Sequence, residues 1–334
     1  VARRLEILQR GGKVMLGEEL NTLDDRELLR IIGGVQVFAR VSPMHKLRIV
    51  RALKRRGEVV AMTGDGINDA PAVKEADIGI AMGLTGTDVT REAASLILAD
   101  DNFKTIVAAV EEGRSIYGNI RKFIRFLLGC NTGEVLTMLL AILSGLPLPL
   151  RPLQILWINL VTDGLPALAL GVDPPEETLM ELPPRRRKEG LFSRGLWGKL
   201  LFRGIMIGAV TVSLFGLALA SGADIAKAQT LAFAALILAQ LVYVYDCRSE
   251  EASFSRNRRR NFLLDGAVLS SCLLMAVVIH HPLLSAIFGT VPLSALEWAA
   301  AFGAAFLPAL PELFASLIKS VFPGKKRAVT GKYS

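Results

Sequence analysis

Cysteine is scarce in this sequence, with 3 residues in a chain of 334. Cys130, Cys247 and Cys272 lie far apart, in or beside apolar runs, and no two of them form a CxxC pair. This spacing argues against a disulfide framework and against a zinc site. We therefore interpret the three cysteines as packing residues.

No signal-peptide pattern is visible in the first residues, and the chain does not have the composition of a disordered protein. Residues 1–10 are charged and amphipathic, with neither an apolar core nor a small-residue cleavage site. Charged residues make up only 21% of the chain and hydrophobic residues 51%, which disfavours disorder. Because the first residue is not methionine, we expect the chain to be part of a longer protein.

What the sequence does contain is a series of long apolar runs. The mean hydropathy of +0.42 is high for a soluble protein. Six runs are each close to the ~20 residues that a helix needs to cross a bilayer. They predict an all-α polytopic membrane domain over residues 125–322, with the lipid bilayer as partner and no nucleic acid. The six predicted spans are residues 125–145, 152–171, 203–220, 227–246, 262–280 and 295–320.

The lysine and arginine residues indicate how these spans are oriented. Basic clusters within 185–188, 256–260 and 325–327 fall in alternate connections, whereas the other connections are short. Basic residues gather in cytoplasmic connections. We therefore expect both ends of the chain to be cytoplasmic, including a tail over residues 323–334. The short loops favour a bacterial cell membrane.

Residues 1–101 instead alternate predicted strands and helices, as is typical of a parallel α/β sheet. Short apolar runs at 35–41, 59–63, 78–82 and 95–99 predict strands. Amphipathic segments at 45–56, 68–76 and 87–94 predict helices that cover the sheet. From Asn102 a long helical pattern, charged at first, predicts a stalk over residues 102–124 that runs into the first span.

A candidate catalytic motif, TGDGIND, follows the second predicted strand. The carboxyl end of a strand is where α/β sheets usually place chemistry. The glycines of the motif permit a tight turn, and its carboxylates and amide offer the oxygen ligands that Mg²⁺ takes at a phosphate. A lysine in the upstream run ARVSPMHK can present a positive charge to a phosphoryl group. Together these residues predict half of a phosphoryl-transfer site. The alternative is that the aspartate-glycine turn is an ordinary surface loop without a catalytic role. The candidates are Thr63, Gly64 and Gly66 in the turn, Asp65, Asn68 and Asp69 beside it, and Lys46.

Polar side chains inside the predicted spans form a second candidate site. Such side chains are energetically unfavourable in a bilayer, so we first consider them as functional residues. A single amide side chain, however, more often forms a hydrogen bond between helices. Gly164 and Pro166 weaken the second span just after Asp163, which can turn backbone carbonyls toward an ion. Carboxylate and amide oxygens suit Ca²⁺, and the absence of thiolates and imidazoles disfavours copper or zinc as cargo. The set consists of Asn131, Glu134, Asn159, Thr162, Asp163 and Gln240.

These motifs resemble those of one family. TGDGINDAPAVKEADIGIAMG, preceded by FARVSPMHK and followed by LADDNF, is similar to the hinge and phosphorylation-domain signature of P-type ATPases. NTGEVLTM and PLQILWINLVTDGLPALALGVDPPE resemble the fifth and sixth transmembrane helices of the calcium-transporting branch. The resemblance covers essentially the whole chain. It implies the C-terminal half of a haloacid-dehalogenase-like α/β phosphorylation domain, followed by six membrane helices.

The resemblance also implies roles for the candidate residues. Asp65 becomes the main Mg²⁺ ligand, supported by Asn68 and Asp69, and Lys46 neutralises an aspartyl-phosphate. The turn residues contact the cofactors, Mg²⁺ and ATP. The membrane set becomes the ligand set for transported Ca²⁺, with protons returning on the carboxylates. Gln240 stands where the two-calcium reticulum pumps carry a glutamate, which leaves one or two ions per cycle open, and Mn²⁺ prefers similar oxygens.

Several parts of such a pump are not in this sequence. It contains no DKTGT motif, whose aspartate accepts the phosphoryl group, and the family order places that motif upstream of Val1. The nucleotide-binding domain, the TGE loop and the first four spans belong upstream as well. We therefore predict the C-terminal part of an ATP-driven calcium pump that does not hydrolyse ATP by itself. The alternative is a short, noncatalytic membrane module that binds an ion or regulates an intact pump.

Overall fold

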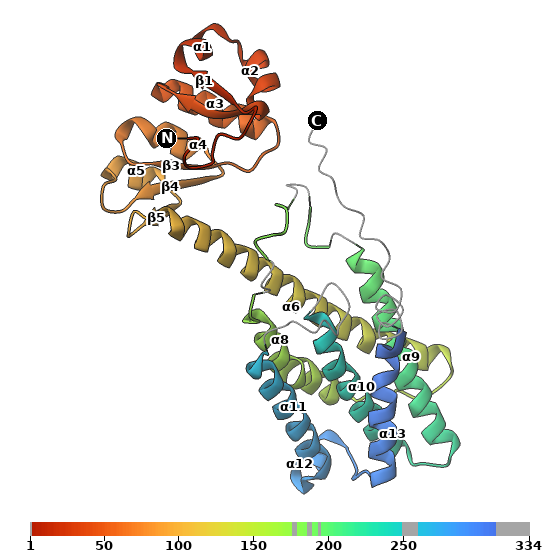
Figure 1. Ribbon diagram of the computed structural model, residues 1–334. Helices are drawn as coiled ribbons and strands as arrows, with labels where there is room; N and C mark the ends of the chain where they lie inside the picture. The colour runs from red at the N-terminus through yellow and green to blue at the C-terminus, as the bar shows by residue number, and fades with distance from the viewer. Residues whose placement is uncertain (1, 176–178, 186–188, 193–194, 249–259, 312–334) are drawn as a thin grey trace. The chain divides into compact units, whose positions relative to one another are not determined.

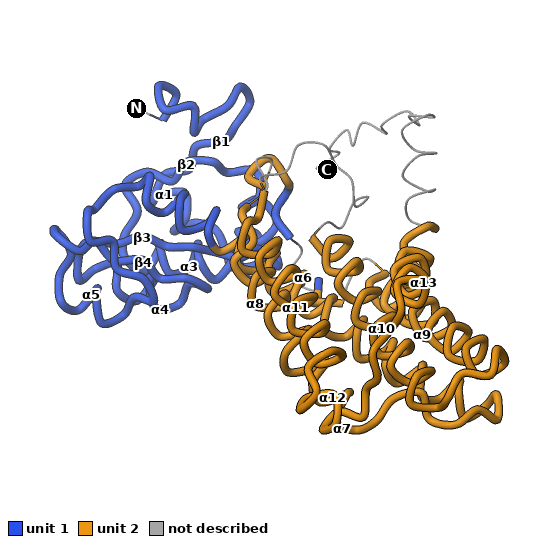
Figure 2. Tube along the Cα trace, turned by 90° about the horizontal axis from the view of Figure 1, so that it is seen from below, with its two compact units in different colours: residues 1–112, 183–189 blue, residues 113–182, 190–334 orange. Residues whose placement is uncertain are grey.

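The computed structural model describes residues 2–175, 179–185, 189–192, 195–248 and 260–311 (Figure 1). The chain divides into two compact units (Figure 2). Unit 1 comprises Val1–Glu112 and Pro183–Glu189, and unit 2 comprises Gly113–Leu182 and Gly190–Ser334. All described strands lie in unit 1, and the regular structure described in unit 2 is helical.

Unit 1 contains two small parallel sheets. β1 (Lys13–Leu16) pairs with β2 (Val35–Ala39), and a second sheet has the order β3 (Ala61–Gly64), β4 (Ile78–Met82) and β5 (Leu96–Leu98). β2 to β5 coincide with the predicted strands to within two residues at each end. β1 lies outside the prediction because only one of its four side chains is buried, which leaves no apolar alternation to detect.

Short helices pack around these strands. They are α1 (Gly17–Thr22), α2 (Asp25–Ile31), α3 (Pro43–Arg55), α4 (Ala70–Glu75) and α5 (Asp88–Ala93), with short 3₁₀ turns η1 (Ile32–Gly34) and η2 (Ile67–Asp69). Helix α3 begins two residues before the predicted start because Ser42 caps it. The Ser42 hydroxyl accepts a bond from the His45 N–H, the His45 ring accepts one from the Ser42 N–H, and Pro43 takes the first position. This cap fixes the start of the helix that carries Lys46.

Helix α6 begins in unit 1 and continues into unit 2. The helices from there onward are α6 (Phe103–Leu143), α7 (Pro152–Trp157), the π-helix η3 (Ile158–Thr162), α8 (Gly164–Gly171), α9 (Leu196–Ala220), α10 (Ile225–Cys247), α11 (Phe262–His280), α12 (Pro282–Phe288), α13 (Ala295–Phe306) and the 3₁₀ turn η4 (Leu307–Ala309).

Five helical segments among the described residues are long and apolar enough to cross a membrane. They are Phe103–Leu143, Pro152–Gly171, Leu196–Ala220, Ile225–Cys247 and Phe262–His280. Five of the six predicted spans therefore have a counterpart. The sixth, residues 295–320, coincides with a shorter apolar helix, Ala295–Ala309. Residues 312–320 and the predicted tail lie outside the described residues.

Helix α10 forms the centre of unit 2. Most of its residues are buried, and it packs against α9, α11 and α13, among which it lies in Figure 1. Helix α11 by contrast exposes leucines on its outer side, with Leu263, Leu269 and Leu273 exposed by 66%, 62% and 59%. Exposed leucines of this kind are unfavourable in water and suit contact with lipid.

Helices α6 and α9 approach each other closely. A Cβ atom added at Gly204 would lie 2.5 Å from the Thr132 side chain, and one at Gly208 would lie 3.1 Å from Leu136. From the other side, a Cβ atom at Gly133 would lie 3.0 Å from Ile207. Small residues on both helices thus bring the two backbones together, as is typical of helix pairs in membranes.

Candidate functional sites

The first candidate site lies at the carboxyl end of β3. The strand ends at Gly64, where an added Cβ atom would lie 2.6 Å from the Cβ atom of Asp69 and 2.9 Å from Val73. Glycine at this position therefore lets Asp69 pack against the end of the strand. Asp69 is 6% exposed and forms an ion pair with Lys46 of α3. The fold thus brings together two of the predicted catalytic residues from separate segments.

Asp65 and Asn68 are exposed at the same turn. The turn is fixed through its backbone, because the Thr87 N–H donates to the Asp65 carbonyl at 3.0 Å and the Thr90 hydroxyl donates to the Gly66 carbonyl at 2.9 Å. These bonds use main-chain oxygens and leave the Asp65 carboxylate facing solvent. Thr87 and Thr90 are supporting residues that the sequence does not reveal, since only the fold places α5 beside the turn.

The oxygens of this turn fit Mg²⁺ as one part of a site. Asp65 offers an exposed carboxylate and Asn68 an exposed amide, whereas Asp69 is engaged by Lys46. Within the described ranges, no three His, Cys, Asp or Glu side chains gather into a metal centre. Mg²⁺ usually binds one or two carboxylates and takes its other ligands from phosphate and water. The arrangement therefore matches the predicted half of a phosphoryl-transfer site.

The second candidate site lies in unit 2, around Glu134 of α6. Glu134 is 4% exposed, and its two carboxylate oxygens accept bonds from the Asn159 amide at 2.7 Å and the Gln240 amide at 2.9 Å. These amides come from η3 and α10, so three of the predicted membrane residues meet. Both partners are uncharged, and these contacts leave the negative charge of Glu134 uncompensated.

An irregular turn precedes Asp163. In the π-helix η3, the Asp163 N–H donates to the Ile158 carbonyl, five residues earlier, at 2.9 Å. Pro166 has no N–H to donate to the Thr162 carbonyl, which accepts instead from the Ser271 hydroxyl of α11 at 3.1 Å. The helix is thus interrupted at Asp163, between η3 and α8, and the irregular stretch extends back to Ile158, further than the predicted weak point just after Asp163. Such π turns are frequent at functional sites.

Asp163 is a buried carboxylate at the end of the π-helical turn. It is 1% exposed, and neither of its carboxylate oxygens has a hydrogen-bond partner among the described residues. Cys130, one turn before Glu134 on α6, belongs with Cys247 to the buried hydrophobic core of unit 2, and Cys272 packs against this core. These positions agree with the interpretation of the three cysteines as packing residues.

Asn131 does not join the other predicted calcium ligands. Its side chain is exposed, whereas Glu134, three residues later on α6, is buried. Residues three apart on a helix point about 60° away from each other. Asn131 therefore lies at the edge of the face that carries Glu134, and its role as a ligand stays a prediction.

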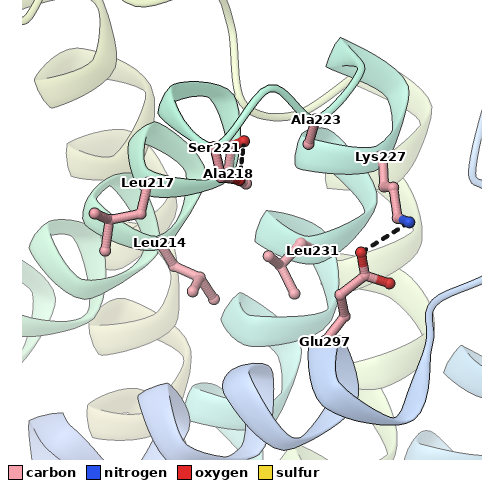
Figure 3. A pocket seen from close by; sticks show the side chains of 8 residues that line it. All are labelled: Leu214, Leu217, Ala218, Ser221, Ala223, Lys227, Leu231 and Glu297. Atoms are coloured by element: carbon pink, nitrogen blue, oxygen red, sulfur yellow. Dashed lines mark hydrogen bonds and ion pairs between the residues drawn. The ribbon is translucent and has the colours of Figure 1, made fainter.

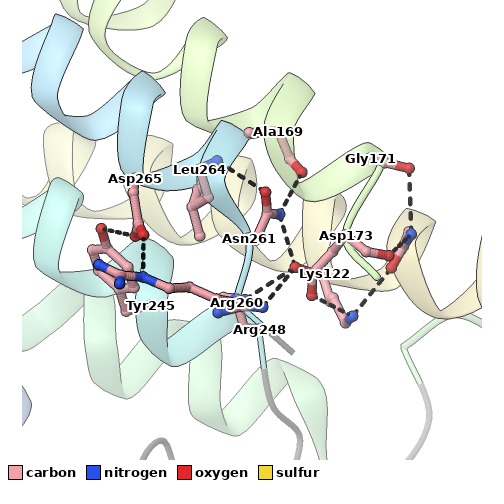
Figure 4. Close-up of polar contacts among 11 residues, drawn as sticks. Lys122, Ala169, Gly171, Asp173, Tyr245, Arg248, Arg260, Asn261, Leu264 and Asp265 are labelled. Atoms are coloured by element: carbon pink, nitrogen blue, oxygen red, sulfur yellow. Dashed lines mark hydrogen bonds and ion pairs between the residues drawn. The ribbon is translucent and has the colours of Figure 1, made fainter. Parts of the chain in front are cut away.

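A polar cluster just after α8 lies outside the predicted sites (Figure 4). Asp173 is 4% exposed, and its carboxylate accepts from Lys122 at 2.8 Å, from Arg248 at 3.0 Å and from Asn261 at 2.8 Å. The Asn119 amide donates to the Asp173 carbonyl at 2.8 Å. Burial by itself raises the pKa of Asp173, but the bonds and charge of Lys122, with Asn261 and Arg248, lower this pKa below its usual value. Asp173 thus ties α6, α10 and the start of α11 to the end of α8.

Replacing Asp173 by alanine should lower the free energy of unfolding by about 3–5 kcal/mol, because it removes the carboxylate that pairs with the largely buried Lys122. Because the folded-state pKa of Asp173 is lowered, its contribution is present above the unfolded pKa and is lost as the pH falls through the folded value. The free energies of unfolding of the wild type and the variant should therefore become equal at acidic pH. Denaturant unfolding in detergent measures the difference, with Asp224→Ala at an exposed position as control. Equal stability of the Asp173 variant and the wild type at neutral pH would contradict this role.

A cavity of about 210 Å³ lies elsewhere in unit 2, between α9, α10 and α13 (Figure 3). Leucines 214, 217 and 231 line it, and Lys227 and Glu297 form an ion pair of 2.9 Å beside it. None of the predicted site residues lines this cavity. It therefore stands apart from the site around Glu134.

Comparison with known proteins gives the family. The family model described as "Cation transporting ATPase, C-terminus" matches residues 147–318, more than half of the chain. The chain belongs to the cation-transporting ATPase family. A second model, described as "haloacid dehalogenase-like hydrolase", matches residues 9–77, which include β1 to β3 and the TGDGIND turn. The resemblance found in the motifs is thus confirmed at the level of the family.

This cation-transporting ATPase is similar to several proteins named calcium-transporting ATPase. It is 55% identical to that of Bacillus subtilis (strain 168) over 309 residues, which cover 92% of this chain and 35% of the relative. It is 46% identical to calcium-transporting ATPase 1 of Bacillus cereus over 315 residues, which cover 89% of this chain and 35% of the relative. It is 40% identical to calcium-transporting ATPase type 2C member 1 of Homo sapiens over 298 residues, which cover 89% of this chain and 32% of the relative. The chain therefore spans about a third of the length of these relatives.

Proposed function

We propose that this cation-transporting ATPase chain is the C-terminal part of an ATP-driven calcium pump that works through an aspartyl-phosphate. The observation that carries this proposal is the pair of buried carboxylates, Glu134 and Asp163. The described partners of Glu134 are uncharged amides, and the Asp163 oxygens have no hydrogen-bond partner among the described residues. Two buried anions of this kind need a cation or protons to be stable. The names of the relatives support Ca²⁺ as the cation that meets this need.

The oxygens around these carboxylates suit Ca²⁺ as cargo. The Gln240 amide donates to Glu134 through its nitrogen, while its oxygen has no hydrogen-bond partner among the described residues. Asn159 and Thr162 bring further oxygens from the π-helical turn, and Asn131 would add one from the edge of α6. Ca²⁺ takes six to eight such oxygens, with carboxylates as the charged ones. After the ion leaves, protons would bind the two carboxylates and return across the membrane.

The turn after β3 would serve the phosphoryl chemistry of the whole pump. Asp65 would hold Mg²⁺ with support from Asn68 and Asp69, and Thr63 and the turn glycines would lie against the phosphate. Mg²⁺, when bound, neutralises charge on the transferring phosphoryl group. Asp69 holds the Lys46 ammonium at the same turn, so Lys46 would place a positive charge beside the aspartyl-phosphate. The phosphorylated aspartate itself would come from upstream sequence.

The proposed pump is an integral protein of a bacterial cell membrane with the phosphoryl site and both ends of this chain in the cytoplasm. The supporting observations are the five apolar helices and the alternation of basic connections. The upstream part of the same protein is the proposed partner of unit 1, because the phosphorylated aspartate must reach the turn after β3.

The experiment that tests this function uses the full-length protein in sealed vesicles. We expect ATP hydrolysis to rise with free Ca²⁺ and calcium to accumulate in the vesicles, whereas residues 1–334 purified alone should not hydrolyse ATP. Activation by Mn²⁺ but not by Ca²⁺ would overturn the choice of ion. Calcium-dependent ATP hydrolysis by residues 1–334 alone would contradict the proposal that the phosphorylated aspartate comes from upstream sequence. A native polypeptide without a phosphorylatable aspartate upstream, shown by its mass and peptide coverage, would favour the noncatalytic module.

A further inference from the structure

Tyr243 of α10 packs directly against the backbone of α6. Its side chain is buried, and its hydroxyl donates to the Arg125 carbonyl of α6 at 3.2 Å. A Cβ atom added at Gly129 would lie 2.4 Å from the ring carbon Cε1 of Tyr243 and 2.6 Å from its hydroxyl oxygen. Any side chain larger than that of glycine at position 129 would therefore collide with the ring. Gly129 and Tyr243 together fix how closely α10 approaches α6.

Contacts from α9 hold the same ring in place. The Arg203 guanidinium lies over the Tyr243 ring, with its central carbon 5.1 Å from the ring centroid. Arg203 in turn forms an ion pair with Asp246 of α10 and donates to the Pro308 carbonyl. The centroid of the Phe126 ring of α6 lies 6.3 Å from that of Tyr243. The Tyr243 ring is thus enclosed by residues of α6 and α9.

The contact at Gly129 lies next to the proposed cation site. Gln240 precedes Tyr243 by three residues on α10, which makes the two side chains neighbours on the helix surface. The Gln240 amide donates to Glu134 at 2.9 Å, and Glu134 follows Gly129 by five residues on α6. Tyr243 and Gln240 therefore contact α6 at two successive levels. A displacement of α10 at the level of Tyr243 would also move the Gln240 amide.

We propose that Tyr243 is a positioning residue of the cation site. By packing against Gly129 it keeps the Gln240 amide at Glu134, and this amide fixes the orientation of the carboxylate that would bind the ion. The same bond holds the Gln240 side-chain oxygen, which has no hydrogen-bond partner among the described residues, in a defined direction. The inference rests on the proposed function, since it takes Glu134 as a ligand of the transported cation.

The first test replaces Gly129 by alanine in the full-length protein. Alanine favours a helix more than glycine does, so α6 should form in this variant. The added methyl group would push the Tyr243 ring away from α6 and break the bond between Gln240 and Glu134. Loss of a group that supports a metal ligand typically lowers metal affinity by about 10–100-fold. We therefore expect the affinity for radioactive calcium, measured at equilibrium without ATP, to fall by about 10-fold or more. Gly118→Ala on the same helix, where an added Cβ atom meets open space, should bind calcium like the wild type.

Two variants of Tyr243 separate the ring from its hydroxyl group. Tyr243→Phe keeps the ring against Gly129 and should bind calcium like the wild type. Tyr243→Leu removes the ring and should lose calcium affinity as Gly129→Ala does. Equal calcium affinities of the wild type, Tyr243→Leu and Gly129→Ala would overturn the inference.

A double-variant comparison distinguishes positioning of Gln240 from a general loosening of the packing. A residue that acts through Gln240 has no further effect once the Gln240 amide is gone, because coupled residues are not additive. In a Gln240→Leu background, Gly129→Ala should therefore leave the calcium affinity at the value of Gln240→Leu alone. A further fall by the same factor as in the wild-type background would show that Gly129 and Tyr243 act independently of Gln240, and would overturn the inference.

Failure of the proposed function gives a different result, which binding of radioactive Mn²⁺ to the same proteins detects. If the wild type bound Mn²⁺ but not Ca²⁺, the choice of ion would fall, and a loss of Mn²⁺ affinity in Gly129→Ala would still support the role of Tyr243. If Ca²⁺ bound equally well to the wild type, Gly129→Ala and Tyr243→Leu, the calcium function would stand and the role of Tyr243 would fall. If the wild type bound neither ion, both would fall.

Discussion

Replacing Asp163 by asparagine should reduce calcium-activated ATP hydrolysis and calcium uptake by the full-length pump at least about 100-fold. The substitution keeps the size of the side chain but removes one of the two buried charges that face the ion. Loss of one partner from a buried ion pair costs about 3–5 kcal/mol, and every ~1.4 kcal/mol is a factor of ten in affinity. The measurement is ATP hydrolysis and uptake in vesicles as a function of free Ca²⁺.

The matched control for this variant is Asp224→Asn. Asp224 precedes α10, is exposed, and its side chain does not cap the helix. The same chemical change there should leave the calcium dependence as in the wild type. Calcium uptake by the Asp163 variant at the wild-type rate would show that Asp163 is not a ligand, and the role of Glu134 would then have to be re-examined.

Asp65→Ala should abolish the Mg²⁺-dependent transfer of phosphate from ATP to the full-length pump, with a loss of about 1000-fold or more. A bound metal ion contributes several kcal/mol of charge stabilisation in such reactions, and each ~1.4 kcal/mol is a factor of ten in rate. The fold should survive, because the Asp65 carboxylate is exposed and the bond from Thr87 goes to the Asp65 backbone carbonyl. Incorporation of labelled phosphate from ATP at a series of Mg²⁺ concentrations measures the effect.

The control for Asp65 is Asp88→Ala, a second aspartate in unit 1. The Asp88 side chain is 90% exposed and pairs with Arg91 one turn later, a type of contact that contributes little to stability. This variant should be phosphorylated like the wild type. If Asp65→Ala were also phosphorylated normally, the metal would have to be held by other residues of the pump and the turn after β3 would lose its assigned role.

Local structure in unit 1 could be predicted from the sequence because its signals are local. The apolar runs that became β2 to β5 are short and bounded, and the TGDGIND turn ends a strand as expected. The start of α3 differs by two residues because Ser42, Pro43 and His45 form a cap, which apolar periodicity does not report. β1 escapes prediction because its burial is too slight to leave a pattern.

Contacts in unit 2 were harder to predict because they join distant segments. Glu134 and Gln240 are 106 residues apart, and their bond depends on how α10 packs against α6. In the same way, Asp173 binds Lys122 and Arg248, which lie 51 and 75 positions away in the sequence. Neither of these two partners stands in a recognisable motif.

The glycine contacts between α6 and α9 bear on how a displacement could reach Glu134. Where Gly204 and Gly208 lie against Thr132 and Leu136, neither helix can rotate past the other without forcing side chains into backbone. The two helices should therefore shift as one body. Any tilt of α6 that displaces Glu134 would carry α9 with it.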